Sequence, residues 1–399
     1  MNIGMVLAGR DFPPDIRVEK EIRALQAKDH RCYVICSSRG NKPFREEREG
    51  TTIYRLTPLV SVLRKINFLF YRLFFVNLQW FRDLLRIAKE ESLDVFHVHD
   101  LNMAGTAIKA GKALNIPVIV DFHENYPAAL MYYGVTKEPN HQKALGVFNR
   151  VSRWQRYEKR VSRKADQVIV VVEEAKERLS KIGIDQTKIT VIENTIDVDF
   201  FQNLEIDQTI LNEYHGYFMI TYIGGYGGWH RGLDTAVKAM PKVLEVIPQA
   251  RLLLVGRGSI KPELEKLVTE LNLKSQVIFE DWRPFEEVPS YIQASQICLV
   301  PHHSNPHTEA TSPHKLFQYM LMGKPVVVSS CKPLQRVVSE TQSGLVFTAG
   351  DSDHLAAVLL QLKDVRLRNK LGQAGRQAVL DRYNWERTSQ DLIRIYDKL

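Results

Sequence analysis

The sequence predicts an α/β protein made of two doubly wound parallel-sheet domains in tandem. Short apolar runs without clean polar alternation are separated by helix-like runs along the whole chain, as buried parallel strands are separated by their crossover helices. The alternation weakens once, near residue 200, and then restarts. A length of 399 residues and a hydrophobic content of 44% suit two globular domains of ordinary size.

The first domain is predicted over residues 1–196 and the second over residues 197–383. The strand-like runs of the first are, in order, NIGMVLA, CYVICS, VFHVH, PVIVDF and QVIVVV. Those of the second are FMITYIGG, RLLLVG, QVIFED, QICLVP, PVVVSS and GLVF. Helix-like runs such as DIRVEKEIRALQAK lie between them. The polar stretch QNLEIDQTILNEYHG, residues 202–216, is interpreted as a linker.

Composition favours a protein of the reducing cytosol with an anionic partner. The formal net charge of +8 favours nucleic acid, a membrane surface or a phosphorylated ligand. Seven cations and one acid fall between Arg150 and Lys164, a run that a solvated helix face explains as well. The first residues lack the basic start and long apolar stretch of a signal peptide. Four scattered cysteines without paired metal spacing suit a reducing compartment: Cys32, Cys36, Cys298 and Cys331.

An aromatic and basic stretch, residues 62–89, breaks the alternation. Seven aromatic residues lie between Phe68 and Phe81, and cations flank and interrupt them. The longest uncharged run, from Leu73 to Phe81, has nine residues, against the roughly 20 that a spanning helix needs. The stretch fits a helix pair in the core of the first domain, or a surface that lies on anionic lipid. Both interpretations hold if only part of the apolar face is buried.

Two glycine-rich loops follow predicted strands of the second domain. The stretch YIGGYGGWHRG has five glycines in eleven residues, and Arg231 lies near its end. Backbone N–H groups at a strand end favour an anion, and an arginine adds a charge-assisted contact suited to phosphate oxygens. Tight strand-to-helix turns also use glycine, and neither loop has the spacing of a dinucleotide or Walker-type site. The loop residues expected at the anion are Gly225, Gly227, Gly228, Gly256, Arg257 and Gly258.

A third element, TEATSPHKLFQYM, reads as a loop that leads into a helix. Pro313 suits the first helical turn, and Lys315 and Gln318 share a helix face. We expect this helix N-terminus to bind an anion and Gln318 to hydrogen-bond a sugar hydroxyl. The alternative is a capped surface helix with a solvated lysine.

These stretches, in this order, resemble the glycosyltransferases of the GT-B fold, close to glycosyltransferase family 4. FPPDIRVEKEIRALQAKDHRCYVICS, FHVHD, VIVDFHENYP and VIENTIDVDFF resemble successive family segments, and GGYGGWHRGLDTAV and RLLLVGRG resemble the diphosphate loops. SPHKLFQYMLMGKPVV resembles the donor-binding helix. The resemblance implies two Rossmann-like domains with a cleft between them, an acceptor-binding first domain and a nucleotide-sugar-binding second one. It also implies that a final helix, about 384–399, crosses back to the first domain.

The resemblance implies roles at individual positions of the donor side. Arg231 matches the basic residue that binds the donor diphosphate, and His123 matches a histidine near the donor sugar and the reaction centre. Tyr226 replaces the family's usual arginine beside a diphosphate-loop glycine, which leaves more of the charge to Arg231 or Lys315.

A further departure concerns the family's pair of glutamates, E-x-x-x-x-x-x-x-E. Gln318 stands at the second, a ribose contact, and Ala310 at the first, with Glu309 one residue early. We expect Glu309, or the backbone there, to hold the sugar.

Softer candidates lie on the acceptor side and in metal-like clusters. The residues expected to face the acceptor are Asp15, Arg17, His99 and Asp100. Arg17 also fits a plain surface cation, and His97 fits a buried, hydrogen-bonded histidine. The DVD of residues 197–199 and the histidines of residues 302–307 lack a convincing metal context, and no metal site is expected.

The predicted function is retaining, metal-independent transfer of a hexosyl or related group from a nucleotide-diphospho-sugar, without a cofactor. The expected acceptor is a lipid-linked glycan for cell-surface polysaccharide. The expected place is the cytoplasm, at the inner face of the cell membrane through residues 62–89, with no nucleic acid partner. The alternatives are a catalytically idle relative that binds sugar nucleotide, a sugar-nucleotide epimerase of the same fold and, on charge alone, a nucleic-acid-binding protein. The sequence leaves the donor's base and sugar, the acceptor and the oligomeric state open.

Overall fold

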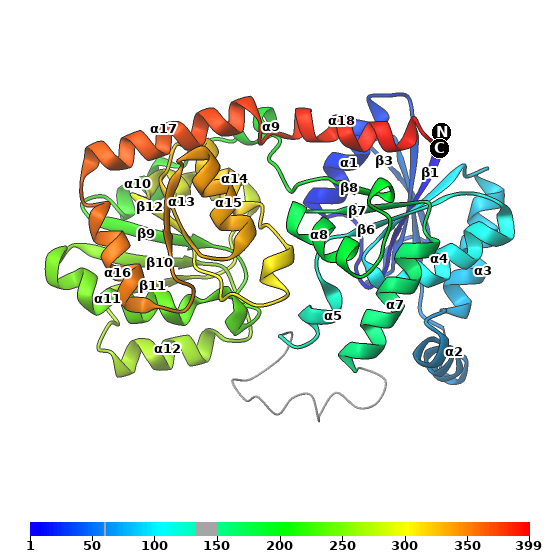
Figure 1. Cartoon of the computed structure of the whole chain (residues 1–399), viewed down its shortest axis with the longest axis horizontal. Coiled ribbons are helices and arrows are strands. Elements are labelled where there is room, and N and C mark those ends of the chain that lie inside the picture. Colours follow the sequence, from blue (N-terminus) through cyan, green and yellow to red (C-terminus); the bar gives the residue numbers. More distant parts are fainter. Residues whose placement is uncertain (60, 133–149) are drawn as a thin grey trace. The chain divides into compact units, whose positions relative to one another are not determined.

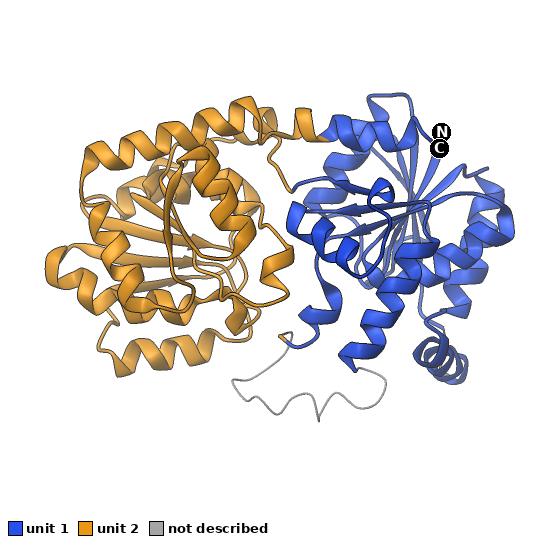
Figure 2. Ribbon diagram, viewed as in Figure 1, with its two compact units in different colours: residues 1–131, 140–193, 389–399 blue, residues 132–139, 194–388 orange. Residues whose placement is uncertain are grey.

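The computed structural model describes residues 1–59, 61–132 and 150–399, which form two compact units (Figure 2). Unit 1 contains the described residues up to 131, residues 150–193 and residues 389–399. Unit 2 contains Tyr132 and residues 194–388. The chain passes from unit 1 to unit 2 at residues 193–194, against a predicted boundary at 196–197.

Unit 1 is built on a sheet with the strand order β3-β4-β2-β1-β5-β6-β7-β8 in the described part of the chain (Figure 1). All neighbours pair in parallel except β3 and β4. The strands are β1 (Asn2–Leu7), β2 (Arg31–Ser37), β3 (Arg45–Arg48), β4 (Thr51–Leu56), β5 (Val95–His99), β6 (Val118–Phe122), β7 (Gln167–Val170) and β8 (Ile189–Val191). The helices are α1 (Ile16–Gln26), α2 (Ser61–Phe74), α3 (Leu78–Glu90), α4 (Leu101–Leu114), α5 (Tyr126–Ala129), α7 (Val151–Lys164), α8 (Glu173–Lys181) and the 3₁₀ turn η2 (Gln186–Lys188).

The sequence misses β3 and β4 because both carry charge. β4 is buried along its whole length although it contains Arg55, whose side chain is 1% exposed. Arg55 is neutralised by Asp11 at 2.9 Å and by Glu46 at 2.6 Å. A cation is tolerated inside a sheet when acids at both ends of its guanidinium compensate the lost hydration.

Unit 2 is built on a fully parallel sheet with the order β11-β10-β9-β12-β13-β14. The six predicted strands of this half are confirmed as β9 (Phe218–Ile223), β10 (Ala250–Val255), β11 (Val277–Glu280), β12 (Ile297–Val300), β13 (Val326–Ser329) and β14 (Gly344–Phe347). The helices are α9 (Val198–Gln202), α10 (Gln208–Glu213), α11 (Leu233–Val246), α12 (Lys261–Glu270), α13 (Val288–Ala294), α14 (Lys315–Leu321), α15 (Lys332–Thr341), α16 (Ser352–Gln361) and α17 (Val365–Asp381). The 3₁₀ turns are η3 (Trp229–Arg231), η4 (Phe285–Glu287) and η5 (Thr308–Ala310). The predicted fold class, two doubly wound parallel-sheet units, is confirmed.

The interpretation of residues 202–216 as a linker is wrong. The segment contains α10, whose Ile210 is buried with Tyr214 in the same apolar cluster as Tyr291 of α13. Asp207 caps α10 by accepting from the Thr209 N–H at 2.7 Å. The polar composition reflects the solvent face of a short amphipathic helix, which a reading of average polarity misses.

The last helix, α18 (Trp385–Tyr396), has residues in both units, with Ser389 as its first residue in unit 1. In unit 2, the Trp385 N–H donates to the Ile196 carbonyl oxygen at 2.8 Å. In unit 1, the Tyr396 hydroxyl lies 2.7 Å from His97 Nδ1 in the core. His97 is therefore the buried, hydrogen-bonded histidine that its position in β5 suggested.

The aromatic stretch divides into two helices with opposite burial. α3 buries Trp80, Leu84 and Ile87 in the core of unit 1. α2 leaves most of its apolar side chains exposed, so the core-helix interpretation holds for α3 only. Within the described residues, no helix combines the length and apolar character that crossing a bilayer requires.

Candidate functional site

The first glycine loop of unit 2 runs from the end of β9 to η3. Gly224 has a φ of +140°, which residues with a side chain rarely adopt. A Cβ atom there would lie 2.4 Å from Lys315 Nζ, so glycine lets the Lys315 ammonium come against the backbone at the end of β9. A Cβ atom at Gly227 would meet no described atom within 4 Å, so the loop is open there. The predicted glycines of this loop are Gly225, Gly227 and Gly228.

The second loop packs directly on the first. A Cβ atom at Gly256 would lie 2.3 Å from the Gly224 carbonyl oxygen, and one at Gly258 would lie 2.2 Å from the Tyr226 carbonyl carbon. The Tyr226 N–H donates to the Arg257 carbonyl oxygen at 3.0 Å. Gly256 and Gly258 are thus required by the contact of loop on loop, independently of any ligand.

Tyr226 braces the two loops from inside. Its ring is completely buried, and its hydroxyl donates to the Leu254 carbonyl oxygen at 2.7 Å. The side chain of Arg257 is exposed, with its guanidinium carbon 5.8 Å from the centre of the Trp282 ring. Tyr226 therefore holds the loops in shape without adding charge, and the cations nearest the first loop are Arg231 and Lys315.

Arg231 and Lys315 form a positively charged pair at the first loop. Lys315 Nζ lies 3.6 Å from the centre of the Tyr222 ring, and Arg231 Nη1 lies 3.4 Å from His302 Nε2. Burial lowers the pKa of Lys315 well below its ordinary value, and the charge of Arg231 lowers it further. Arg231 Nε is buried without a hydrogen-bond partner among the described atoms. An anion with several oxygens would satisfy both cations.

The histidines around Arg231 and Lys315 do not balance the positive charge of this pair. Burial and, after it, the charge of Arg231 lower the pKa of His230 to about 3 and that of His307 to about 4. Burial also lowers the pKa of His302, again with Arg231 as the next cause. All three are neutral at pH 7, and His303 instead pairs with Asp234 at 2.9 Å. In the described part of the chain no carboxylate forms an ion pair with Arg231 or Lys315.

The third predicted element begins later than expected. α14 starts at Lys315 with His314 as N-cap, so Pro313 precedes the helix, and its carbonyl oxygen accepts from the Leu316 N–H at 3.2 Å. Gln318 is buried on this helix, 8% exposed. The alternative of a surface helix with a solvated lysine is wrong, because Lys315 lies over the Tyr222 ring.

Glu309 is already occupied by local hydrogen bonds. One of its carboxylate oxygens accepts from the Ser304 hydroxyl at 2.6 Å. The other accepts from the Lys332 N–H at 3.0 Å, at the first residue of α15. Glu309 thus caps α15, where an acid also complements the helix dipole. A contact with a sugar would compete with this cap.

In unit 1 a buried ion network lies beneath the carboxyl ends of the strands. Arg17 is 3% exposed, and its Nε lies 3.0 Å from Asp121 and 3.0 Å from Glu21. The interpretation of Arg17 as a surface cation is therefore wrong. Burial would raise the pKa of Asp121, but the charges of Arg17 and His123 outweigh it and hold this pKa well below the usual value.

His123, just after β6, is held by acids on two sides. Its Nε2 lies 3.3 Å from Asp121 and its Nδ1 lies 3.7 Å from Asp100. Burial lowers the pKa of His123, but Asp100 and Asp121 outweigh it and raise the pKa to about 9. Burial lowers the pKa of His99 to about 4. Since neutral His99 Nδ1 lies 3.2 Å from His123 Nε2, His99 accepts a hydrogen bond from the charged ring.

Asp15 and Asp100 are joined by Arg10, which sequence reasoning missed. Arg10 contacts Asp15 at 2.6 Å and Asp100 at 2.7 Å. Asp15 also caps α1, since it accepts from the Val18 N–H at 3.2 Å. Asp100 has a φ of +67°, a strained conformation for a residue with a side chain, and such strain is found at functional sites.

Four side chains of this network resemble a set of metal ligands. Glu21, His97, His99 and Asp121 each place one nitrogen or oxygen within 4.8 Å of the others. Arg17 forms ion pairs with both carboxylates, and a guanidinium there would repel a divalent cation. The DVD motif has a structural role as well, since Asp197 caps α9 through the Phe200 N–H at 3.1 Å. The absence of a metal requirement stays a prediction.

Two family models together match most of the chain. The model described as Glycosyltransferase Family 4 matches residues 16–200, and the one described as Glycosyl transferases group 1 matches residues 217–364. The chain belongs to the family 4 glycosyltransferases. The predicted resemblance is thereby confirmed.

Curated relatives of this glycosyltransferase act on inositol-containing molecules, by their names. A phosphatidyl-myo-inositol mannosyltransferase of Mycolicibacterium smegmatis is 24% identical over 320 residues, which cover 77% of this chain and 72% of that protein. A D-inositol 3-phosphate glycosyltransferase of Thermomonospora curvata is 23% identical over 323 residues, 76% of this chain and 71% of that protein.

Solved structures show the same fold. A sucrose-phosphate synthase from Thermosynechococcus elongatus matches with a TM-score of 0.79 and 20% identity, over 100% of this chain and 98% of that one. HepE of Anabaena, solved in complex with UDP-glucose, matches with a TM-score of 0.74 and 14% identity, over 99% of this chain and 100% of that one. The glycosyltransferase therefore has the GT-B fold.

The sequence analysis did not predict a role for three residues that take part in these sites: Asp121, Glu21 and Tyr222. Asp121 had a signal in the sequence, because an acid within the apolar run VIVDF must be paired if the run is a buried strand. Tyr222 offered none, since a tyrosine at a strand end is ordinary core.

The raised pKa of His123 makes the stability of the glycosyltransferase depend on pH. Because the folded pKa of about 9 exceeds the ordinary histidine value of 6.5, the contribution to stability is complete below about pH 6.5 and lost as pH rises through 9. We expect the urea midpoint of the wild type to fall between about pH 6.5 and pH 9 and that of His123→Gln to fall less.

The exposed His215 provides the matched control, and His215→Gln should keep the wild-type slope. Identical slopes for His123→Gln and wild type would contradict the assignment, as would an imidazole pKa near 6.5 for His123 in an NMR titration.

Proposed function

We propose that this glycosyltransferase transfers a hexosyl or related group from a nucleotide-diphospho-sugar to an acceptor hydroxyl with retention of configuration. The observation that carries the proposal is the pair Arg231 and Lys315, partly buried beside the glycine loops and without a carboxylate partner in the described residues. The two phosphates of a sugar nucleotide supply the missing negative charge. HepE, a structural relative, was solved with UDP-glucose.

The same two cations assist the chemical step. Breaking the bond between sugar and diphosphate leaves positive charge on the ring and negative charge on the leaving group. Arg231 and Lys315, fixed before the reaction, stabilise the departing diphosphate. Burial lowers the pKa of Lys315, and an arriving diphosphate opposes this shift and favours the charged ammonium. We propose that these cations take the place of a metal ion.

His123 supplies the reaction centre from unit 1. Asp121 and Asp100 keep its imidazole protonated and oriented at the end of β6. We assign it a contact with a donor-sugar hydroxyl, in agreement with its match to the family histidine. Its charge is balanced by buried acids, so its role is positioning by hydrogen bond rather than attraction of a second phosphate.

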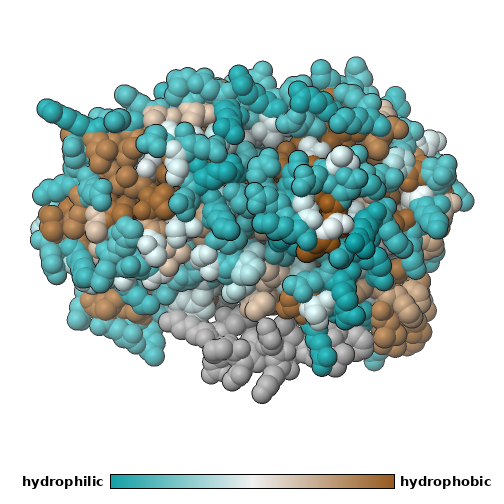
Figure 3. Space-filling model, viewed as in Figure 1, coloured by the Kyte–Doolittle hydropathy of each residue, from teal (hydrophilic) through white to brown (hydrophobic). Residues whose placement is uncertain are grey.

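The proposed acceptor is lipid-linked and reaches the enzyme at the inner membrane surface through α2. Val62, Ile66, Leu69 and Leu73 form one stripe along this helix, and they are 67%, 56%, 55% and 47% exposed. Figure 3 shows hydrophobic residues gathered over the place of α2 in Figure 1. Exposed cations on the same helix, Arg64 and Lys65, complement anionic headgroups. The curated relative named a phosphatidyl-myo-inositol mannosyltransferase supports a lipid acceptor.

A second candidate is a relative that binds sugar nucleotide without transferring the sugar. It is favoured by Glu309, whose carboxylate caps α15, and by Gln318 in place of the second glutamate. The two candidates differ in turnover: tight donor binding with neither hydrolysis nor transfer supports the idle relative. Conversion of the donor to an isomer would instead indicate an epimerase.

We expect Arg231→Ala to lower the turnover number at least about tenfold, which corresponds to roughly 1.4 kcal/mol of lost transition-state stabilisation. The measurement is steady-state donor hydrolysis, which needs no identified acceptor. Arg366→Ala, at an exposed position of α17, should leave the rate unchanged. Wild-type turnover in Arg231→Ala would remove Arg231 from the mechanism.

We expect the protein to co-sediment with phosphatidylglycerol vesicles at low salt and to be released as ionic strength rises. The double variant Ile66→Ser with Leu69→Ser should lose most of this binding, because it interrupts the apolar stripe. The matched control, Val365→Ser with Leu380→Ser, removes two exposed apolar side chains of α17 in unit 2. Equal sedimentation of both double variants would refute membrane docking by α2.

A further inference from the structure

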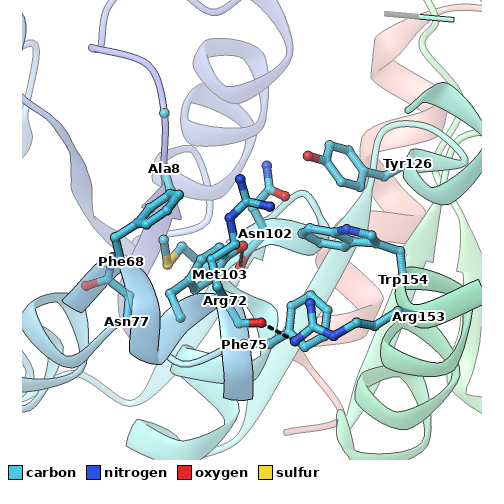
Figure 4. Close-up of a pocket in the computed structure, with 12 residues that line it drawn as sticks. Ala8, Phe68, Arg72, Phe75, Asn77, Asn102, Met103, Tyr126, Arg153 and Trp154 are labelled. Atoms are coloured by element: carbon cyan, nitrogen blue, oxygen red, sulfur yellow. Dashed lines mark hydrogen bonds between the residues drawn. The ribbon is translucent and has the colours of Figure 1, made fainter. Parts of the chain in front are cut away.

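A cavity of about 340 Å³ opens in unit 1 between α2, α4, α5 and α7. Five of its twelve lining residues are aromatic and two are arginines: Phe68, Tyr71, Phe75, Tyr126 and Trp154, with Arg72 and Arg153. The volume falls in the lower part of the range for small-ligand sites, roughly 300–1,000 Å³. Figure 4 shows its side chains contributed by separate elements, with Trp154 and Phe75 on the α7 side.

Arg153 fixes the geometry of the cavity. Its guanidinium donates to the carbonyl oxygens of Arg72 and Leu73 near the end of α2, the latter at 3.0 Å. The same group lies 4.0 Å from the centre of the Phe75 ring. Arg153 therefore ties the C-terminal end of α2 to α7, with a carbonyl contact of the kind that stabilises helix C-termini. It acts on the cavity as a positioning residue.

Arg72 is the cation that the cavity presents. Its guanidinium carbon lies 4.8 Å from the centre of the Phe68 ring. Asn102, at the start of α4, and Tyr126, at the start of α5, both line the cavity, and Asn102 Oδ1 is buried without a hydrogen-bond partner among the described atoms. The backbone oxygen of Asn102 is held by the Tyr71 hydroxyl at 3.0 Å. A cation and two neutral polar groups thus meet against aromatic walls.

The charge around the cavity is positive. Burial lowers the pKa of Arg153, and the charges of Arg72, Arg160 and Arg156 lower it further. Because Arg72, Arg156 and Arg160 bring like charges near Arg153, an anion in the cavity would relieve the repulsion. The positive charge around the cavity and the arrangement of its polar side chains therefore both favour an anionic ligand.

The cavity connects two features already described. Asn102 follows Asp100 by two residues and Tyr126 follows His123 by three, so the cavity adjoins the strand ends that carry the proposed reaction-centre histidine. On its other side, Phe68 and Arg72 belong to α2, whose exposed apolar stripe is the proposed membrane contact. A ligand here would have a polar end toward His123 and an apolar end toward the lipid.

We propose that this cavity binds the phosphate of a lipid acceptor, with Arg72 as its cation and Asn102 and Tyr126 as hydrogen-bonding partners. The inference rests on the proposed function, since it names the acceptor class of that reaction. The aromatic walls take the first methylenes of the lipid chain, and the group to be glycosylated extends from the phosphate toward His123. A lipid is favoured over a soluble phosphate ester because the apolar stripe continues from the cavity along α2.

The test compares ligands that separate the phosphate from the chain. Three ligands are titrated into the whole protein by calorimetry: dodecyl phosphate, dodecyl glucoside and glycerol phosphate. The two dodecyl compounds are kept below their critical micelle concentrations. We expect dodecyl phosphate to bind at least about tenfold tighter than either of the others. Arg72→Gln should abolish its advantage over dodecyl glucoside, and Arg72→Lys should retain part of it. Lys164→Gln, which removes a charge from the exposed C-terminal end of α7, should bind as the wild type does.

Three results would overturn the proposal. Equal affinity for dodecyl phosphate and dodecyl glucoside means that the phosphate is not recognised. Equal affinity for glycerol phosphate means a soluble ligand, and wild-type affinity in Arg72→Gln places the phosphate elsewhere. UDP and GDP titrated into the same protein test the donor site separately. If the protein binds neither UDP nor GDP, the proposed function is contradicted, while the lipid-phosphate result still stands.

Discussion

The Lys315 ammonium lies over the Tyr222 ring and against Gly224, beside Arg231, with no carboxylate in the described residues to balance either cation. Placing two partly buried cations side by side in this way is unfavourable unless an anion joins them. The φ of +140° at Gly224 favours glycine, which also leaves room for the ammonium, 2.4 Å from where a Cβ atom would lie. The chemistry of unit 2 follows from this uncompensated charge.

In unit 1, by contrast, the buried charges are compensated by ion pairs. Arg17 is shared by Asp121 and Glu21, and Arg10 joins two further acids. This compensated network orients His123 and keeps it protonated without creating a strong anion site. In the proposed reaction, the cations of unit 2 stabilise the diphosphate, and unit 1 holds a charged imidazole.

The cavity beside α2 adds a third arrangement, in which Arg72 and Arg153 lie among aromatic rings and Arg153 already donates to carbonyl oxygens of α2. Such a site favours a ligand with one phosphate and an apolar neighbour, whereas the pair of cations in unit 2 suits a diphosphate. α2 has a double role in this account, because its inner side lines the cavity and its outer stripe faces solvent.

The parallel strands of both units were predictable because each is an uninterrupted apolar run, and the loops were predictable because glycine and arginine follow those runs. β4 was not, since Arg55 in a buried strand makes sense only once its acidic partners from distant positions are known. Arg17 looked like a surface cation for the same reason. Gly256 and Gly258 were assigned to a ligand, but the contact with the first loop also requires them. Sequence pattern thus gives the elements, while partners far apart in the chain decide what a charged residue does.

The most direct measurement is a crystal structure of the protein with a bound nucleotide-diphospho-sugar. The account predicts that the oxygens of the two phosphates lie within hydrogen-bond distance of the Arg231 guanidinium and the Lys315 ammonium, over the backbone of Gly227. A diphosphate bound elsewhere, with Arg231 and Lys315 making no contact to it, would contradict the account.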